Sequence, residues 1–224
     1  MYLAPGKLTL RFVITGLVTM AVLFLTGTAW AQRPPGMDVS DYQSPGLNWA
    51  DAKANGISFA WAKATEGLTI NDANFTTYEA NSLAAGVLIG AYHYAHPELH
   101  IGTAGADQEA AHFWGVASNY VKGGGVYLMP MLDIEQDLSS ARPAYTATTL
   151  SEWVNEWCND IVDYAASNGV TVKPVVYTYT SYATGNSGEG PGFNSTGTVW
   201  PLWMAQYPAS PNPQTGAPSV VYHN

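Results

Sequence analysis

The stretch Tyr127-Leu128-Met129-Pro130-Met131-Leu132-Asp133-Ile134-Glu135-Gln136 is a short apolar run that ends in two carboxylates. Three glycines precede it, and a short aliphatic run bounded by glycines predicts a buried strand. Alternate residues of a strand share a face, so Asp133 and Glu135 are expected to point the same way and Ile134 the opposite way. Carboxylates at the end of a buried strand are costly unless they are paired or used. The pair therefore marks either a polar exit to solvent or a functional site.

Segments typical of strands and helices alternate on both sides of this stretch. Further strands are expected at residues 37–39, 57–64, 87–95, 172–179, 202–207 and 220–222. Helices are expected at residues 49–55, 71–85, 104–120 and 149–168. Repeated alternation of strands and helices, with strands apolar on both faces, indicates a parallel sheet covered by helices. This pattern leaves two architectures open, an open doubly wound sheet and a closed barrel.

Two local patterns refine this outline. Thr149-x-x-Glu152 resembles a capping box at the start of the last long helix, which Gly169 ends. The segment from Ser181 to Thr198 is rich in glycine, serine and asparagine and has no helical period, although a crossover helix is expected there. We therefore expect a long loop at this position.

The first 31 residues are typical of a secretory signal peptide and are not expected to be part of the fold. Lys7 and Arg11 provide positive charge before a short apolar run, Phe12 to Leu25. Ala29-Trp30-Ala31 then places small residues before Gln32, as at a signal-peptidase site. The apolar run is shorter than the ~20 residues that a membrane span needs. We therefore expect a cleaved, secreted protein with no membrane attachment.

Residues 32–224 are expected to form one domain, whose length allows a sizeable core. Acidic residues outnumber basic ones, 17 to 8, which argues against nucleic acid and anionic membranes as partners. Cys158 is the only cysteine, so the chain has no internal disulfide, and no Cys/His spacing predicts a zinc site. We expect a monomer without a metal or other cofactor.

Polar and aromatic residues gather at the predicted carboxyl ends of the strands, where parallel α/β folds build their sites. The acids there are Asp38, Glu66, Asp133 and Glu135, and the other side chains are Tyr92, Tyr177, Trp203 and Gln206. Aromatic rings stack on the apolar faces of sugars. Glycoside hydrolysis needs one protonated carboxyl group and a second group that stabilises positive charge at the anomeric carbon. The pattern therefore favours carbohydrate chemistry, although the spacing on a strand leaves the stereochemical course open.

The histidines support other interpretations. His93 lies between two tyrosines on a predicted buried strand and is expected to be a hydrogen-bonded core histidine, whereas His96 and His100 fall in the following loop. Two function classes besides hydrolysis by carboxylates remain open at this point. One is a non-catalytic glycan-binding protein that keeps the aromatic cleft, and the other is a metal-dependent hydrolase that uses His93, His96 and the acids.

Five motifs occur in order along the chain: Gly36-Met37-Asp38-Val39-Ser40, Ala62-Lys63-Ala64-Thr65-Glu66-Gly67, Gly90-Ala91-Tyr92-His93-Tyr94-Ala95, Leu132-Asp133-Ile134-Glu135 and Trp203-Met204-Ala205-Gln206-Tyr207. As an ordered set they resemble the glycoside hydrolase family 25 lysozymes, the N-acetylmuramidases. The resemblance implies a shortened, irregular (β/α) barrel of the TIM-like type. It also implies cleavage of the β-1,4 bond between N-acetylmuramic acid and N-acetylglucosamine in peptidoglycan.

The resemblance implies a role for each residue at a matching position. Glu135 would be the general acid/base, Asp133 would orient the 2-acetamido group or stabilise charge at the sugar, and Asp38 would complete the acidic cluster. The sugar-binding residues would be Glu66, Tyr92, Tyr177, Trp203 and Gln206. The route stays open between participation of the acetamido group and attack by an enzyme carboxylate.

Two features differ from the family's pattern. The family ends with a further strand that carries another aspartate, after a segment that matches Val220-Val221-Tyr222-His223, whereas this chain stops at Asn224. We therefore expect a C-terminally truncated catalytic domain whose barrel lacks its last strand and exposes an edge. The glycine-rich segment from Ser181 to Thr198 is the second difference, because it replaces an expected helix.

Overall fold

The computed structural model describes residues 34–121, 126–141, 145–194 and 199–205. The predicted signal peptide, the predicted strand at 220–222 and Gln206 lie outside these ranges. Within them, no helix is long and apolar enough to cross a membrane.

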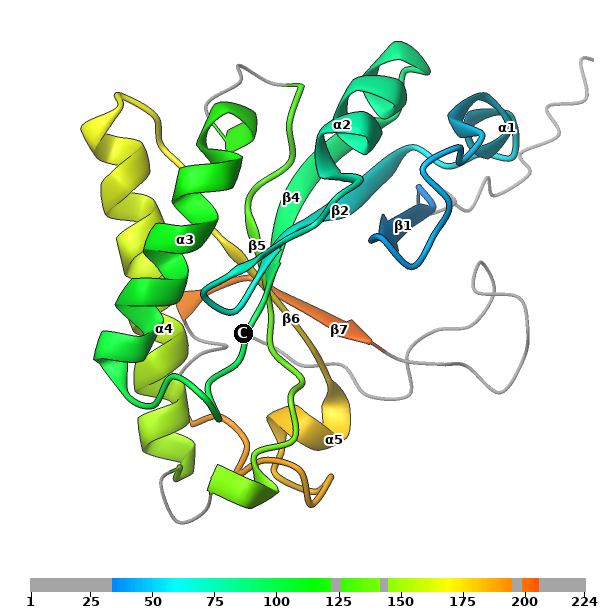
Figure 1. The fold of residues 1–224 in the computed structure, drawn as a ribbon. Coiled ribbons are helices and arrows are strands. Elements are labelled where there is room, and N and C mark those ends of the chain that lie inside the picture. The colour runs from blue at the N-terminus through cyan, green and yellow to red at the C-terminus, as the bar shows by residue number, and fades with distance from the viewer. Residues whose placement is uncertain (1–33, 122–125, 142–144, 195–198, 206–224) are drawn as a thin grey trace, which may run out of the picture. The chain divides into compact units, whose positions relative to one another are not determined.

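The described residues form a mostly parallel sheet (Figure 1). Its strands, in spatial order, are β1 (Gly36–Val39), β2 (Phe59–Glu66), β4 (Leu88–Tyr94), β5 (Met131–Asp133), β6 (Val175–Tyr179) and β7 (Leu202–Ala205). Each strand pairs in parallel with the next, and the short β3 (Ile70–Asn71) adds an antiparallel pair beside β2. Because the strands follow one another in chain order, the sheet is singly wound, as in a barrel, and not doubly wound.

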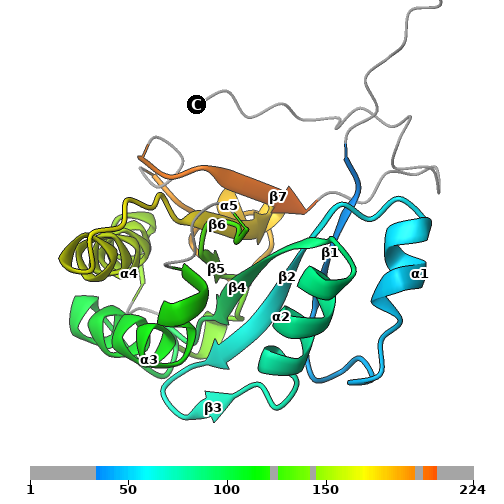
Figure 2. The same ribbon diagram turned by 90° about the horizontal axis from the view of Figure 1, so that it is seen from above.

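The helices of the described residues are α1 (Trp49–Ala54), α2 (Phe75–Ala84), α3 (Thr103–Val121), the 3-10 turn η1 (Ser139–Ala141), α4 (Ala147–Ser167) and α5 (Thr180–Ala183). Helices α3 and α4 lie side by side along one face of the sheet, as Figures 1 and 2 show. The core between them and the strands is fully buried and rich in aromatic rings, including Phe113, Trp153 and Trp157.

The sheet is strongly curled, which the aromatic contacts across its concave side demonstrate. Three strands separate β2 from β7, so a flat sheet would hold them about 19 Å apart. Yet Trp61 on β2 and Trp203 on β7 have ring centroids 4.7 Å apart, and Phe59 lies 6.4 Å from Trp203. Gly90 on β4 pairs with Trp61 on β2 and leaves room for the indole ring. A Cβ atom on residue 90 would lie 2.8 Å from the indole nitrogen. The predicted shortened barrel is thus confirmed as a partial barrel.

Several predicted boundaries differ from those of the structure, and two of the differences have a clear local cause. Strand β5 covers only Met131–Asp133, so Glu135 follows the strand and does not lie on it. Pro130, which has no N–H group to donate, immediately precedes the strand. Helix α4 begins at Ala147, two residues earlier than predicted, because Thr146 caps it and forms the capping box with Thr149.

The predicted loop after β6 is confirmed in most of its described length. Only α5, a single turn at Thr180–Ala183, is helical between β6 and Asn194. A full crossover helix is therefore not present in the part of this segment that the structure describes.

Candidate active site

A cleft of about 370 Å³ opens at the carboxyl ends of β1, β2, β4, β5 and β6. It is lined by Asp38, Ser40, Tyr42, Lys63, Glu66, Tyr92, Tyr94, His96, Met131, Asp133, Glu135, Gln136 and Tyr177. The carboxyl ends of parallel strands are the edge at which barrel folds build their sites.

Most of the predicted site residues meet in this cleft. They are Asp38, Glu66, Tyr92, Asp133, Glu135 and Tyr177. Trp203 is not among the lining residues, because its ring packs against Trp61 and Phe59 inside the curl of the sheet. Gln206 lies outside the described residues.

Asp133 is the most deeply buried acid of the cleft, at 8% exposure. Burial raises the pKa of its carboxyl group well above the ordinary value, and the nearby charges of Glu135 and Asp38 raise it further. Its Oδ1 atom has no hydrogen-bond partner among the described residues. A buried oxygen without a partner costs free energy unless a ligand pairs with it, so this atom is a candidate for substrate contact.

Glu135 is half-buried and lies two residues beyond Asp133, on the same side of the chain. The intervening Ile134 is fully buried, and its N–H donates to the carbonyl of Tyr177 at 3.0 Å, which extends the strand-like alternation past the end of β5. Burial raises the pKa of Glu135, and the charges of Asp38 and Glu189 raise it further. A raised pKa keeps a carboxyl group protonated, which a general acid requires.

Asp38 on β1 is the third acid of the cleft. Strand β1 forms one edge of the described sheet. Its side chain is more open to solvent than those of Asp133 and Glu135, yet partial burial still raises the pKa of its carboxyl group. Tyr92 lies in the same cleft, buried and hydrogen-bonded to the Ser40 side chain. The three acids thus share one cavity with aromatic walls.

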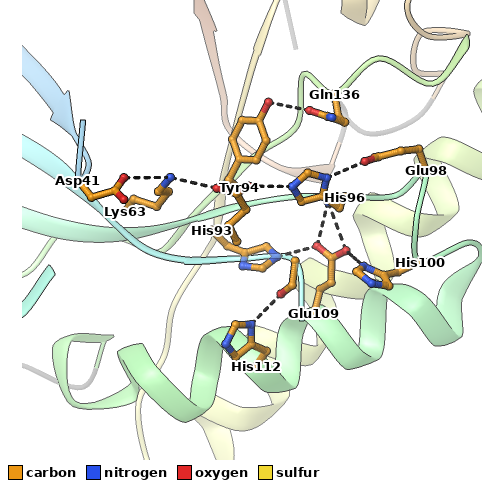
Figure 3. Close-up of polar contacts among 12 residues, drawn as sticks. Asp41, Lys63, His93, Tyr94, His96, Glu98, His100, Glu109, His112 and Gln136 are labelled. Atoms are coloured by element: carbon orange, nitrogen blue, oxygen red, sulfur yellow. Dashed lines mark hydrogen bonds and ion pairs between the residues drawn. The ribbon is translucent and has the colours of Figure 1, made fainter. Parts of the chain in front are cut away.

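A chain of ion pairs forms another wall of the cleft (Figure 3). Lys63 is buried and contacts Glu66 at 3.0 Å and Asp41 at 3.6 Å. The imidazole of His96 contacts the other oxygen of Glu66 at 3.0 Å and Glu98 at 2.6 Å. These bonds, with Glu98 the strongest influence, raise the pKa of His96 to about 9.

Glu66 is ionised in this arrangement. Burial opposes its ionisation, but the hydrogen bonds from His96 and Lys63 outweigh burial and lower its pKa. Both of its carboxylate oxygens are therefore engaged with protein cations, one with each.

His93 is a core residue, as predicted. Its Nδ1 lies 2.7 Å from the Thr65 hydroxyl, and its Nε2 lies 2.7 Å from Glu109 on α3, with both side chains of that pair fully buried. Burial lowers the pKa of His93, so the neutral ring donates to Glu109 and accepts from Thr65. Since both ring nitrogens of His93 and of His96 are engaged, neither residue has a nitrogen free to bind a metal.

The sequence interpretation did not name several cleft residues as substrate contacts, namely Ser40, Tyr42, Lys63, Tyr94, His96, Met131 and Gln136, although it considered His96 as a metal ligand. Alternation along β4 places Tyr94 on the same face as Tyr92, so the spacing of these two tyrosines contained the signal for Tyr94. The position of His96 depends on the fold of the loop after β4, which no short-range pattern reveals.

Comparisons with known proteins agree with this geometry. The sequence profile described as Glycosyl hydrolases family 25 matches residues 37–223. Lysozyme M1 of Streptomyces globisporus is 34% identical over 161 residues, which cover 71% of this chain and 50% of that protein. N,O-diacetylmuramidase of Chalaropsis sp is 32% identical over 151 residues, which cover 66% of this chain and 65% of that protein. The chain thus spans only about half to two thirds of the length of these two relatives.

Solved structures give the same result. A muramidase from Trichobolus zukalii superposes with a TM-score of 0.62 at 28% identity, covering 83% of this chain and 82% of that one. A family GH25 lysozyme from Aspergillus fumigatus superposes with a TM-score of 0.63 at 27% identity, covering 82% of this chain and 80% of that one. Because the profile match extends over nearly all of the sequence and the fold agrees with it, this chain belongs to the glycosyl hydrolases of family 25.

Proposed function

We propose that this chain is a muramidase, which hydrolyses the β-1,4 bond between N-acetylmuramic acid and N-acetylglucosamine in peptidoglycan. Family membership and the names of the relatives, lysozyme and N,O-diacetylmuramidase, support this proposal. The observation that carries it is the cleft that gathers Asp38, Asp133 and Glu135, with the pKa of each carboxyl group raised by burial.

Glu135 is the proposed general acid/base. Its raised pKa keeps the carboxyl group protonated, so the group can donate a proton to the oxygen of the leaving sugar. The carboxylate that results can then activate a water molecule. Its half-buried position allows contact with both the substrate and solvent.

Asp133 is the proposed partner of the substrate's 2-acetamido group. Its unpartnered Oδ1 can accept the amide N–H, which would fix the acetamido group beside the anomeric carbon. Asp38 completes the acidic cluster and stabilises positive charge that develops on the sugar.

Tyr92 and Tyr177 are the proposed sugar contacts in the cleft, because both line it and both present aromatic rings. Glu66 lines the cleft as well, but the engagement of both its oxygens favours a role in holding Lys63 and His96 in place.

We also propose that the chain acts outside the cell as a monomer, that residues 1–31 are a cleaved signal peptide, and that peptidoglycan is its macromolecular partner.

Replacement of Glu135 by glutamine tests the proposal. The amide keeps the size of the side chain but cannot donate the proton, so we expect release of reducing sugar from purified peptidoglycan to fall by at least about 100-fold. The matched control is Glu152→Gln on the exposed side of α4, which removes the same charge and should keep full activity.

Two results would contradict the proposal. Retained turnover in Glu135→Gln would remove Glu135 from the chemistry. A wild-type protein that is retained on insoluble peptidoglycan without cleaving it would instead support a non-catalytic glycan-binding protein.

A further inference from the structure

Glu135 lies beyond the last ladder pair of β5. Its neighbours are still bonded to the sheet, because the Ile134 N–H donates to the carbonyl of Tyr177 and the Tyr94 hydroxyl group donates to Oε1 of Gln136. The segment that carries Glu135, residues 135–138, has two polar contacts that come from the glycine-rich region after β6. The hydroxyl group of Tyr182 donates to the carbonyl of Gln136 at 3.1 Å, and the Leu138 N–H donates to the carbonyl of Glu189 at 2.6 Å. Leu138 itself is fully buried, which fixes the far end of the segment.

The 184–193 loop that provides these contacts is tightly folded. Gly185 and Gly192 both have positive φ, and a Cβ atom on Gly192 would lie 2.6 Å from the Gly185 nitrogen, so only glycines allow the two strands of the loop to meet there. The loop is closed by the Phe193 N–H, which donates to the carbonyl of Ala183 at 2.8 Å. The sequence pattern that predicts a loop thus produces an ordered support with a defined conformation.

Glu189 is the charged residue at the inner side of this loop. Its carboxylate accepts a hydrogen bond from the hydroxyl group of Tyr179, at the end of β6, and its own N–H donates to the Ser187 hydroxyl at 3.1 Å. Its backbone carbonyl holds Leu138, as described above. One residue therefore connects β6, the loop and the segment that carries Glu135.

We propose that Glu189 is a positioning residue for the reaction: its carboxylate accepts from Tyr179 and its backbone carbonyl accepts from Leu138, so it anchors the segment, residues 135–138, that carries Glu135. This inference rests on the proposed function of Glu135 as general acid. Glu189 does not line the cleft, so it acts through Glu135 and not on the substrate.

The charged groups around Glu135 add an electrostatic consequence of this placement. Asp38 on β1 and Glu189 in the loop both raise its pKa, after burial, and Asp133 on β5 interacts with it as a further like charge. Tyr94 on β4 also faces Glu135, and its own pKa is raised, first by burial and then by charges that include Asp133 and Glu135. Among these groups Glu189 is the one that can be changed without altering a residue that lines the cleft.

Two substitutions separate the charge from the anchor. Glu189→Gln removes the charge but retains an oxygen that can accept from Tyr179, so the pKa of Glu135 should fall. The alkaline limb of the kcat/KM profile should then move to lower pH by about half a pH unit.

Tyr179→Phe keeps the charge but removes the anchoring hydroxyl group, so kcat should fall roughly 10-fold without a downward shift of that limb. Glu152→Gln, which removes a distant exposed charge, should change neither quantity.

A carboxyl carbon-13 titration of Glu135 in the wild type and in Glu189→Gln measures the pKa directly and does not require turnover. The expected result is a lower pKa in the variant. An unchanged titration, or an unchanged pH profile in an active wild type, would overturn the role of the charge, and unchanged kcat in Tyr179→Phe would overturn the role of the anchor. An inactive wild type with a normal shift in the titration would contradict the proposed function but not the placement of Glu189.

Discussion

At the residue scale, the spacing of Asp133 and Glu135 was sufficient to predict that both point the same way, but not that they share a site. Alternation around the buried Ile134 places both acids in the cleft, even though only Asp133 belongs to the strand ladder. The sequence could not predict that His96 bonds to one oxygen of Glu66, because that contact joins residues brought together by the loop after β4. Short-range patterns predict the direction of a side chain, but its polar partners depend on tertiary structure.

Glu79 on α2 is a buried acid that the proposed chemistry does not use. It is 1% exposed, neither carboxylate oxygen has a partner among the described residues, and burial raises its pKa to about 8. The folded state therefore prefers the protonated form, whereas the unfolded chain ionises near pH 4.5. This group costs no stability below pH 4.5, and its cost grows as the pH rises to about 8.

Glu79→Gln should therefore raise the free energy of unfolding by a larger amount at pH 8 than at pH 4.5. Denaturant unfolding of both proteins at the two pH values measures the difference. An equal change at both pH values would show that Glu79 has the same pKa in the folded and the unfolded states, which would contradict the effect of burial.

At the scale of elements, Glu109 joins α3 to the loop that shapes the cleft. Its carboxylate contacts Nε2 of His93 on β4, Nδ1 of His100 at 2.5 Å and the backbone N–H of His96 at 3.1 Å (Figure 3). Burial opposes its ionisation, but the bond from His93 and the other donors lower its pKa. The helical period identified α3, yet no pattern in that helix indicated that Glu109 would be its buried link to β4.

Glu109→Ala leaves one buried donor and two partly buried donors without an acceptor, so we expect it to lower the free energy of unfolding by about 3 kcal/mol. Glu152→Ala, the same substitution at an exposed position of α4, should stay within about 0.5 kcal/mol of the wild type. Urea unfolding of the two variants makes the comparison. Equal stabilities would contradict the role of Glu109 as a buried anchor.

At the scale of the whole described fold, alternation of strands and helices predicted a parallel sheet but left open whether it curls. The contact of Trp61 and Trp203 across the concave side shows that the sheet is curled. Curvature is a property of strand tilt and register over many strands, so no single motif contains it. The resemblance to a known family, and not periodicity, provided the correct expectation of a barrel.

The central claim is that the acids at the open end of this curled sheet cleave the glycan at the muramic acid. Its most direct test is mass analysis of the soluble fragments after the wild-type protein digests purified peptidoglycan. We expect newly formed reducing ends that carry N-acetylmuramic acid, in fragments that keep their peptide stems. New reducing ends on N-acetylglucosamine, or cleavage within the peptides alone, would contradict it.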